Sequence, residues 1–156
     1  MEEFLEFKGQ DEKKPHYLWA EKYRPNNMEE YVGNDSLKES MSRYIKEGDL
    51  GHLMFFGPPG TGKTTLAKML VKKIDCDYLY INASNENGVE VIRQKITGFA
   101  ASAGFRNLKI IILDEADFLT GNAQAALRNT METYASHTRF ILTCNYHEKI
   151  ISPIAS

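Results

Sequence analysis

Short apolar runs alternate with amphipathic stretches along most of the chain. Four runs are predicted to be buried strands, at residues 53–56, 78–82, 109–114 and 139–144. Three stretches repeat their apolar positions every three to four residues, as a helix with one buried face does, at residues 63–74, 89–103 and 122–134. Strands and helices in alternation predict an α/β fold, in which a mostly parallel sheet is covered by helices on both faces.

A further amphipathic helix is predicted before the first strand. Its apolar face consists of Leu37, Met41, Tyr44 and Ile45. Asp35 or Ser36 can cap its start by accepting a hydrogen bond from the first turn, and Gly48 can end it. A short turn of helix is expected near residues 148–151. Residues 1–15 mix charge with two phenylalanines, so we expect a disordered tail there and one domain over 16–156.

Composition limits the classes of function. The 156 residues carry a net charge of −2, which argues against wholesale electrostatic attraction to nucleic acid, so any DNA contact must be local. Cys76 and Cys144 are far apart in the sequence and belong to no CxxC or Cys/His motif, so neither a disulfide framework nor a zinc site is indicated. No apolar run approaches the roughly 18 residues of a membrane span. We expect the protein in the cytoplasm, or in a nucleus if its source has one.

A glycine-rich segment between the first strand and its helix matches the phosphate-loop pattern G-x-x-x-x-G-K-[ST]. Its residues are Gly57, Pro58, Pro59, Gly60, Thr61, Gly62, Lys63, Thr64 and Thr65. Backbone N–H groups in such a turn can wrap a polyphosphate, and the following helix presents the positive end of its dipole. Lys63 is then expected to reach the β and γ phosphates of ATP, and Thr64 to offer a hydroxyl to Mg²⁺. A plain Gly/Pro surface turn would leave the strand and the Lys-Thr pair unexplained.

The strand over 109–114 ends in carboxylates, as the second half of an ATPase site does. Asp114 is predicted to hold the water shell of Mg²⁺, and Glu115 to orient and polarise the attacking water. An apolar strand ending in Asp-Glu is by itself often only a solvated strand end. The phosphate loop about fifty residues upstream favours the catalytic interpretation.

Asn145 follows the last predicted strand and is a candidate sensor of the γ-phosphate or its water. Asparagine after a strand is also a common turn former, so position alone leaves both interpretations open.

These blocks together resemble the small ATPase subunits of sliding-clamp loaders, the replication factor C group within the AAA+ ATPases, including phage versions. The resemblance covers nearly everything from Trp19 to Ser156. Its blocks are residues 21–25, 32–34, 57–65, 82–85, 110–117, 123–128 with 131–132, 144–145 and 151–154. The run Glu-Lys-Tyr-Arg-Pro at 21–25 and the block at 123–132 are more specific than a phosphate loop, which many ATPases share.

The resemblance implies a phosphate-loop AAA+ fold with three α/β/α layers, and an ATPase that uses ATP and Mg²⁺. It implies a part in DNA replication, the ATP-dependent loading of a sliding clamp onto primer-template DNA within a hetero-oligomer, pentameric in the family. A non-catalytic fragment that binds nucleotide or partner subunits is the alternative. A helicase loader or branch-migration motor is disfavoured by the blocks at 21–25 and 123–132.

The resemblance also implies roles for single residues. Those implied to line the adenine pocket are Tyr23, Arg24, Pro25 and Val32, although a packed N-terminal clip would have the same composition. Asn145 becomes the family's sensor. Arg128 would couple neighbouring subunits, or else is an exposed helical arginine.

The predicted helix over 89–103 corresponds to the family element that follows the DNA backbone. Arg93 and Lys95 occupy its basic positions and fit phosphate contacts that carry no sequence information. The family commonly has Asp then Arg before this helix, whereas Asn-Glu-Asn stands here at 85–87, which leaves a plain solvated helix face as the alternative. In the segment where relatives touch the clamp, Phe105 is favoured over Phe99 as the contact.

The family pattern Ser-Arg-Cys begins at Ser156, so its arginine finger, the last strand of the sheet, the helical lid and the collar domain do not appear in this sequence. We therefore expect a fragment or split gene that binds adenine nucleotide weakly, hydrolyses it slowly and does not load clamps alone. The strand over 53–56 should lie at an edge of the sheet, and exposed apolar edges invite pairing with another chain.

Overall fold

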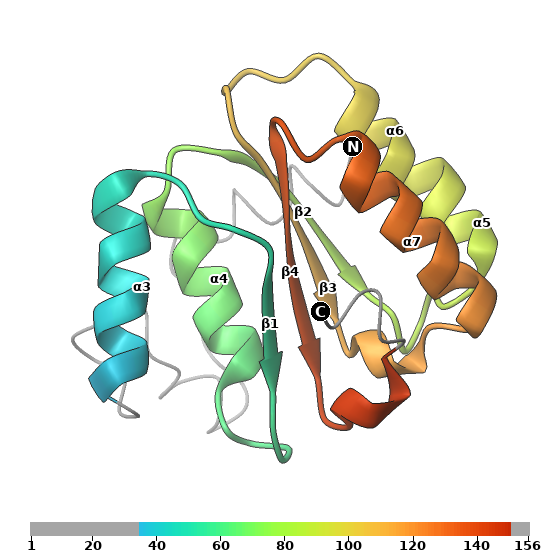
Figure 1. The fold of residues 1–156 in the computed structure, drawn as a ribbon, viewed down its shortest axis with the longest axis horizontal. Helices are drawn as coiled ribbons and strands as arrows, with labels where there is room; N and C mark the ends of the chain where they lie inside the picture. The colour runs from blue at the N-terminus through green and yellow to red at the C-terminus, as the bar shows by residue number, and fades with distance from the viewer. Residues whose placement is uncertain (1–34, 151–156) are drawn as a thin grey trace, which may run out of the picture.

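Residues 35–150 are described by a computed structural model (Figure 1). Its strands are β1 (Leu53–Phe56), β2 (Asp77–Asn82), β3 (Lys109–Asp114) and β4 (Thr138–Cys144). Its longer helices are α3 (Asp35–Glu47), α4 (Lys63–Lys73) and α7 (Gly121–Thr133). Between β2 and β3 run α5 (Val89–Val91), the π-helical η1 (Ile92–Ile96) and α6 (Thr97–Ala101), and two short 3₁₀ turns are η2 (Ala116–Phe118) and η3 (His147–Lys149). The predicted tail over 1–15 and the residues after 150 lie outside the described part.

The four strands form one parallel sheet in the order β1-β4-β3-β2. Leu53 of β1 pairs with Ile141 of β4, and Tyr78 of β2 pairs with Ile110 of β3. The predicted α/β class with a parallel sheet is therefore confirmed. β1 lies at one edge of this described sheet, where the sequence placed it.

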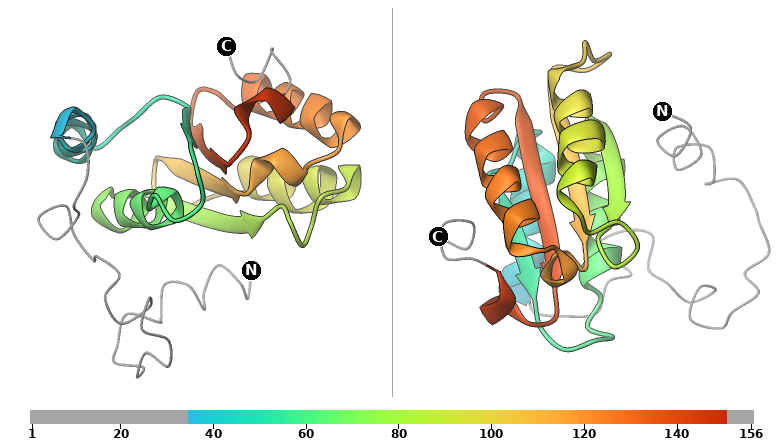
Figure 2. Two further views of the ribbon diagram at one scale, coloured as in Figure 1. Left: turned by 90° about the horizontal axis from the view of Figure 1, so that it is seen from below. Right: turned by 90° about the vertical axis from the view of Figure 1, so that its right-hand side faces the viewer.

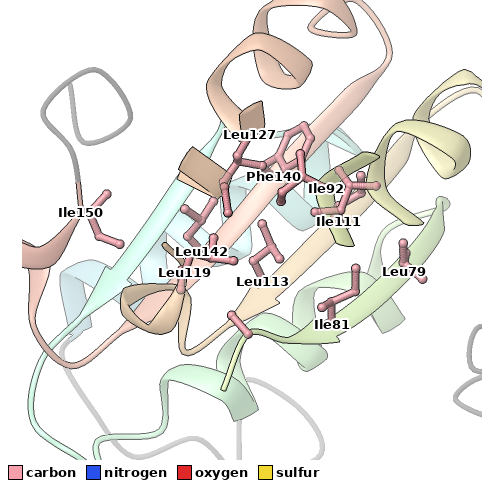
Figure 3. Packing of buried hydrophobic residues seen from close by; sticks show 14 of the residues in the cluster. Leu79, Ile81, Ile92, Ile111, Leu113, Leu119, Leu127, Phe140, Leu142 and Ile150 are labelled. Carbon is pink, nitrogen blue, oxygen red and sulfur yellow. The ribbon is translucent and has the colours of Figure 1, made fainter. Parts of the chain in front are cut away.

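Helices cover both faces of the sheet, so the molecule has three layers (Figures 1 and 2). Alternate strand residues point to opposite faces, which gives two cores. One core lies under α5, η1, α6 and α7 and contains Ile111, Leu113 and Phe140 (Figure 3). The other lies under α3 and α4 and contains Ile110 and Ile112.

The end of α3 follows the predicted signal. α3 begins at Asp35, and Met41 on its apolar face is buried. Gly48 follows the helix with φ 71° and donates its N–H to the Tyr44 carbonyl at 2.9 Å. A left-handed φ of this kind carries little steric cost only for glycine, which explains why the helix ends there.

The stretch predicted as one α-helix over 89–103 is interrupted, and it ends at Ala101. In η1 the Thr97 N–H donates to the Ile92 carbonyl, five residues back, and the Thr97 hydroxyl donates to the same oxygen at 3.0 Å. The buried residues Ile92, Ile96 and Ala100 are spaced by four. Residues four apart drift by roughly 40° around an α-helix. The wider π turn reduces this drift and keeps all three on the core side.

A buried lysine anchors this helix to the first residue of β3. Lys109, which is 3% exposed, donates from Nζ to the Phe99 carbonyl at 2.8 Å and to the Ser102 carbonyl. Phe99 lies in the last turn of α6 and Ser102 directly follows the helix, where a cation is favoured by the helix dipole. Burial lowers the pKa of the Lys109 ammonium, and the nearby Asp77 carboxylate partly offsets that shift.

No helix within residues 35–150 is both long enough and apolar enough to cross a membrane.

We predict that lowering the pH from neutral will destabilise the fold through His52. Its Nδ1 accepts the Phe140 N–H at 3.1 Å, which requires the unprotonated nitrogen. Partial burial, and then the charge of Arg139, lower the pKa of His52 from 6.5. The stability that this contact provides is therefore complete above pH 6.5 and is lost as the pH falls from there through the folded-state pKa.

Urea unfolding on both sides of that pH range measures the effect. The variant His52→Asn keeps an acceptor oxygen and does not titrate, so it should lose less stability on acidification than the wild type. An equal loss in both proteins would show that other groups carry the pH dependence.

The open edge of β1 predicts self-association at high concentration. Its outer backbone groups face no strand within the described residues, and Phe56 is 58% exposed at the end of the strand. Light scattering should show particle mass rising with concentration, and less so in Phe56→Lys, because a charge on an edge strand opposes pairing. A strict monomer at millimolar concentration would contradict this prediction.

Candidate nucleotide-binding site

The predicted chemistry gathers at one edge of the sheet. In a parallel sheet the carboxyl ends of all strands lie along the same edge. Phe56 pairs with Cys144 and Leu113 pairs with Leu142, so the glycine-rich loop after β1 and the carboxylates that end β3 lie beside the end of β4. The structure therefore brings Lys63, Asp114, Glu115 and Asn145 to the same edge, as the sequence predicts.

The loop between β1 and α4 is tied to the sheet and to itself. The Gly57 N–H donates to the Cys144 carbonyl at 3.3 Å, and the Thr61 hydroxyl donates to the Pro58 carbonyl at 2.9 Å. Gly60 and Gly62 have φ of 81° and 86°, a conformation that side chains with a Cβ rarely adopt. The glycine pattern of the motif is thus required by the turn itself.

Lys63 begins α4 and folds back over this loop. Its Nζ donates to the Gly57 carbonyl at 2.9 Å, the Pro58 carbonyl at 2.8 Å and the Thr61 hydroxyl at 3.3 Å. Gly62, at the N-cap, provides no side-chain cap, so the first N–H groups of α4 are not capped by that residue. The ammonium group and the start of α4 both favour an anion at this place.

Asp114 is the centre of the site. It is 6% exposed, and three hydroxyl groups donate to its carboxylate. Thr64 Oγ1 lies 2.7 Å from Oδ1, Thr143 Oγ1 also bonds to Oδ1, and the Tyr80 phenol lies 2.7 Å from Oδ2. Three different elements, α4, β4 and β2, therefore converge on one carboxylate.

The alternation of the strands explains this convergence. Ile112 of β3 and Ile141 of β4 face α4, so Asp114 and Thr143, each two residues later, face it as well. Tyr80 packs against the same core from β2. Sequence reasoning missed Thr143 and Tyr80. The alternation of side chains along each strand would identify these two residues only once the order of the strands in the sheet was known.

Glu115 has the only positive φ of a non-glycine residue in the described chain, at 54° with ψ 46°. Its N–H donates to Thr143 Oγ1 at 3.0 Å, so one threonine holds both neighbouring acidic residues. A left-handed non-glycine residue is strained, and such residues cluster at functional sites. The chain then turns into η2, which the sequence analysis did not predict.

Asn145 is half-buried and follows directly on β4. In the next turn the Tyr146 N–H donates to Asp117 Oδ2 at 3.3 Å. Asp117 Oδ1 is buried and has no hydrogen-bond partner among the described residues. Burial, and then the negative charge of Asp117, raise the pKa of the Cys144 thiol to about 11, so this cysteine is neutral at ordinary pH.

The remaining predicted residues are not part of this cluster. Tyr23, Arg24, Pro25 and Val32 lie outside the described residues. The basic residues Arg93 and Lys95 are in η1, which packs on the opposite face of the sheet from α4. Arg93 is exposed, and Lys95 forms an ion pair with Glu86 at 2.7 Å.

Two further predicted contacts lie on the surface. Arg128 on α7 pairs with Glu132 one turn later at 3.2 Å, and both side chains are exposed. Phe105 is 96% exposed, whereas Phe99 packs against the core. The preference for Phe105 as a surface contact is therefore compatible with its exposure. A protein contact there stays a prediction.

Comparison with known proteins begins with a family model. The model described as "ATPase family associated with various cellular activities (AAA)" matches residues 53–156, which is most of the chain. The match contains both the glycine-rich loop and the acidic end of β3.

Among curated proteins, the replication factor C small subunit of Sulfolobus acidocaldarius is 49% identical over 146 residues, covering 89% of this chain and 45% of that protein. The replication factor C small subunit of Natronomonas pharaonis is 48% identical over 145 residues, with the same coverage. The chain thus spans about half the length of the curated relatives it matches.

Among solved structures, the RuvB Holliday junction branch migration motor of Thermotoga maritima superposes with a TM-score of 0.69 at 20% identity. The match covers 85% of this chain and 45% of that one. At this identity the likeness shows the fold alone.

We predict that Thr143→Val destabilises the protein, whereas Thr138→Val does not. Both threonines are buried in β4, at 1% and 0% exposure. Thr143 bonds to Asp114 and to the Glu115 N–H, so its loss should lower the free energy of unfolding by about 1–3 kcal/mol. Thr138 Oγ1 has no hydrogen-bond partner among the described residues, so valine there should leave stability unchanged or raise it.

Urea denaturation of the two variants measures the difference, and each is the control for the other. Equal effects at both positions would show that the hydroxyl contacts to the acidic residues contribute nothing specific to stability.

Proposed function

The chain belongs to the AAA family of ATPases, and from this premise we propose that it binds ATP with Mg²⁺ and hydrolyses it as the ATPase core of a sliding-clamp loader small subunit. The observation that carries the proposal is the contact of Thr64 with Asp114 beside the glycine-rich loop, at 2.7 Å. A hydroxyl from the start of a helix, a strand-end carboxylate and a phosphate-binding loop are the three parts of a Mg²⁺-nucleotide site.

The donor set fits Mg²⁺ rather than a transition metal. Mg²⁺ is usually bound by one or two protein oxygens together with phosphate oxygens and water. Thr64 and Asp114 supply such oxygens. No cluster of three or more His, Cys, Asp or Glu residues that could hold a metal occurs within residues 35–150. The bound ion would neutralise charge on the phosphates.

In the proposed site each residue has one task. Lys63 and the loop from Gly57 to Thr65 bind the phosphates. Glu115 accepts the proton of the attacking water, and Asn145 contacts the γ-phosphate or that water. Support for these roles is their common position at the carboxyl edge of the sheet. The proposed adenine pocket is Tyr23, Arg24, Pro25 and Val32.

The proposed partners are other loader subunits in a pentamer, a sliding clamp and primer-template DNA. Support comes from the relatives named replication factor C small subunit. Arg93 and Lys95 would touch the DNA backbone, and Arg128 would couple adjacent subunits. Such a protein works where DNA is replicated, in the cytoplasm or a nucleus. Hydrolysis by the isolated chain is proposed to be slow, because a neighbour's arginine can contribute about 10³-fold or more.

A non-catalytic nucleotide-binding module is the second candidate. The phosphate loop and Lys63 support it equally, because they suit nucleotide binding whether or not hydrolysis follows. Both candidates predict nucleotide binding, so only the chemical step separates them. A branch-migration motor is not proposed, because the resemblance to RuvB rests on the fold alone.

We expect Glu115→Gln to lower the single-turnover rate of ATP hydrolysis by about 10²- to 10⁴-fold while nucleotide binding is retained, because glutamine cannot accept a proton. Rapid-quench assays with enzyme in excess measure the rate, and equilibrium binding measures affinity. Glu39→Gln, an exposed substitution on α3, is the matched control and should not change the rate.

Equal rates in wild type and Glu115→Gln would contradict the enzyme and favour the binding module. Strong ATPase activity of the isolated chain that DNA and a clamp stimulate further would contradict the expectation of slow hydrolysis.

A further inference from the structure

The two oxygens of Asp114 are held differently. Both threonines, Thr64 and Thr143, bond to Oδ1, whereas the Tyr80 phenol donates to Oδ2 at 2.7 Å. A carboxylate held through one oxygen can still rotate about its Cβ–Cγ bond. A second contact on the other oxygen fixes the plane of the group.

Tyr80 reaches this oxygen from the neighbouring strand. It lies on β2 and pairs with Ile112, two residues before Asp114 on β3. Its side chain is half-buried and packs against the α4 side of the sheet. A shorter side chain at this position could not span the diagonal to Asp114.

A lysine on α4 packs on the ring of Tyr80. Lys68 Nζ lies 4.7 Å from the ring centroid. Lys68 follows Thr64 by four residues, so both side chains lie on one face of α4, one turn apart. The cation–π contact favours one ring orientation, and a nearby positive charge makes the phenol a stronger hydrogen-bond donor.

Nucleotide binding would affect the hydrogen bond from Thr64 to Asp114 differently from those of Thr143 and Tyr80. If the Thr64 hydroxyl oxygen binds Mg²⁺ through a lone pair, as the proposed function requires, its O–H can still donate to Asp114, but the metal then sets the direction of that hydroxyl. Tyr80 and Thr143 do not belong to the phosphate loop and can keep their contacts. They therefore remain to orient the carboxylate when the metal arrives.

We propose that Tyr80 is a positioning residue for the Mg²⁺ site, which holds Asp114 in the orientation that receives the metal ion. This inference rests on the proposed function, because it concerns the same site. Tyr80 touches neither nucleotide nor metal and acts through Asp114. Lys68 supports it by fixing the ring.

The test compares nucleotide affinity with and without Mg²⁺. A fluorescent non-hydrolysable ATP analogue is titrated into the full 156-residue chain in EDTA and over a series of Mg²⁺ concentrations. Tyr80→Phe keeps the ring and its contact with Lys68 but removes the hydroxyl. We expect affinity in EDTA to be unchanged, and the Mg²⁺ concentration for half-maximal enhancement to rise by about 3- to 10-fold.

A matched control removes a phenol hydroxyl elsewhere on the same strand. Tyr78, two residues earlier on the same face of β2, is buried and pairs with Ile110, four residues before Asp114. Tyr78→Phe should leave the Mg²⁺ dependence unchanged, whatever it does to stability. Thermal melting of each variant shows that the protein is folded under the assay conditions.

The outcomes separate this inference from the proposed function. A wild type that binds the analogue with no dependence on Mg²⁺, or not at all, overturns the proposed function and the inference with it. A wild type with Mg²⁺-dependent binding that Tyr80→Phe reproduces overturns the inference alone. Equal losses in EDTA and in Mg²⁺ for Tyr80→Phe also overturn it, since they indicate a purely structural role.

Discussion

The Asp114 carboxylate and its three hydroxyl donors are the interaction on which the site depends. A carboxylate that is 6% exposed must be compensated, because a buried charge without partners is costly. Thr64, Tyr80 and Thr143 supply that compensation from α4, β2 and β4. Satisfying this one charge therefore also sets the position of α4 relative to the sheet. The hydrogen bonds that stabilise the fold here are also those on which the proposed site depends.

β3 carries a buried charged residue at each end, and both are anchored. Lys109 at its start donates to carbonyls at the end of α6, and Asp114 at its end accepts from three hydroxyls. The residues between them are apolar and fully buried, so they would tolerate a shift of register with little change in polarity. The two anchored ends oppose such a shift. They hold Glu115 at the sheet edge, where Thr143 binds its N–H.

Sequence patterns predicted the elements and missed the contacts between them. Strand and helix positions, the glycine-rich loop, Asp114 and Glu115 all follow from local spacing and motif chemistry. Thr143 and Tyr80 do not, because their roles depend on which strands are neighbours and which faces they share. The π turn at η1 is also non-local, since it follows from keeping Ile92, Ile96 and Ala100 against one core. The proposed role of Arg93 and Lys95 is also non-local, because it depends on a contact with another molecule and not on the spacing of residues within the helix.

The side chains that the proposed ligands would contact form hydrogen bonds with other residues of the same site. Lys63 donates to three oxygens of the loop, and Thr64 donates to Asp114. In the proposed function, nucleotide would displace the Lys63 contacts and exchange neutral acceptors for phosphate oxygens. The Lys63 ammonium would then face a charged acceptor in place of neutral ones, so the exchange at Lys63 favours binding. The Thr64 hydroxyl could bind the cation through an oxygen lone pair while its O–H still donates to Asp114. The orientation of the Asp114 carboxylate before a cation arrives therefore depends on its contacts with Tyr80 and Thr143, which lie outside the glycine-rich loop.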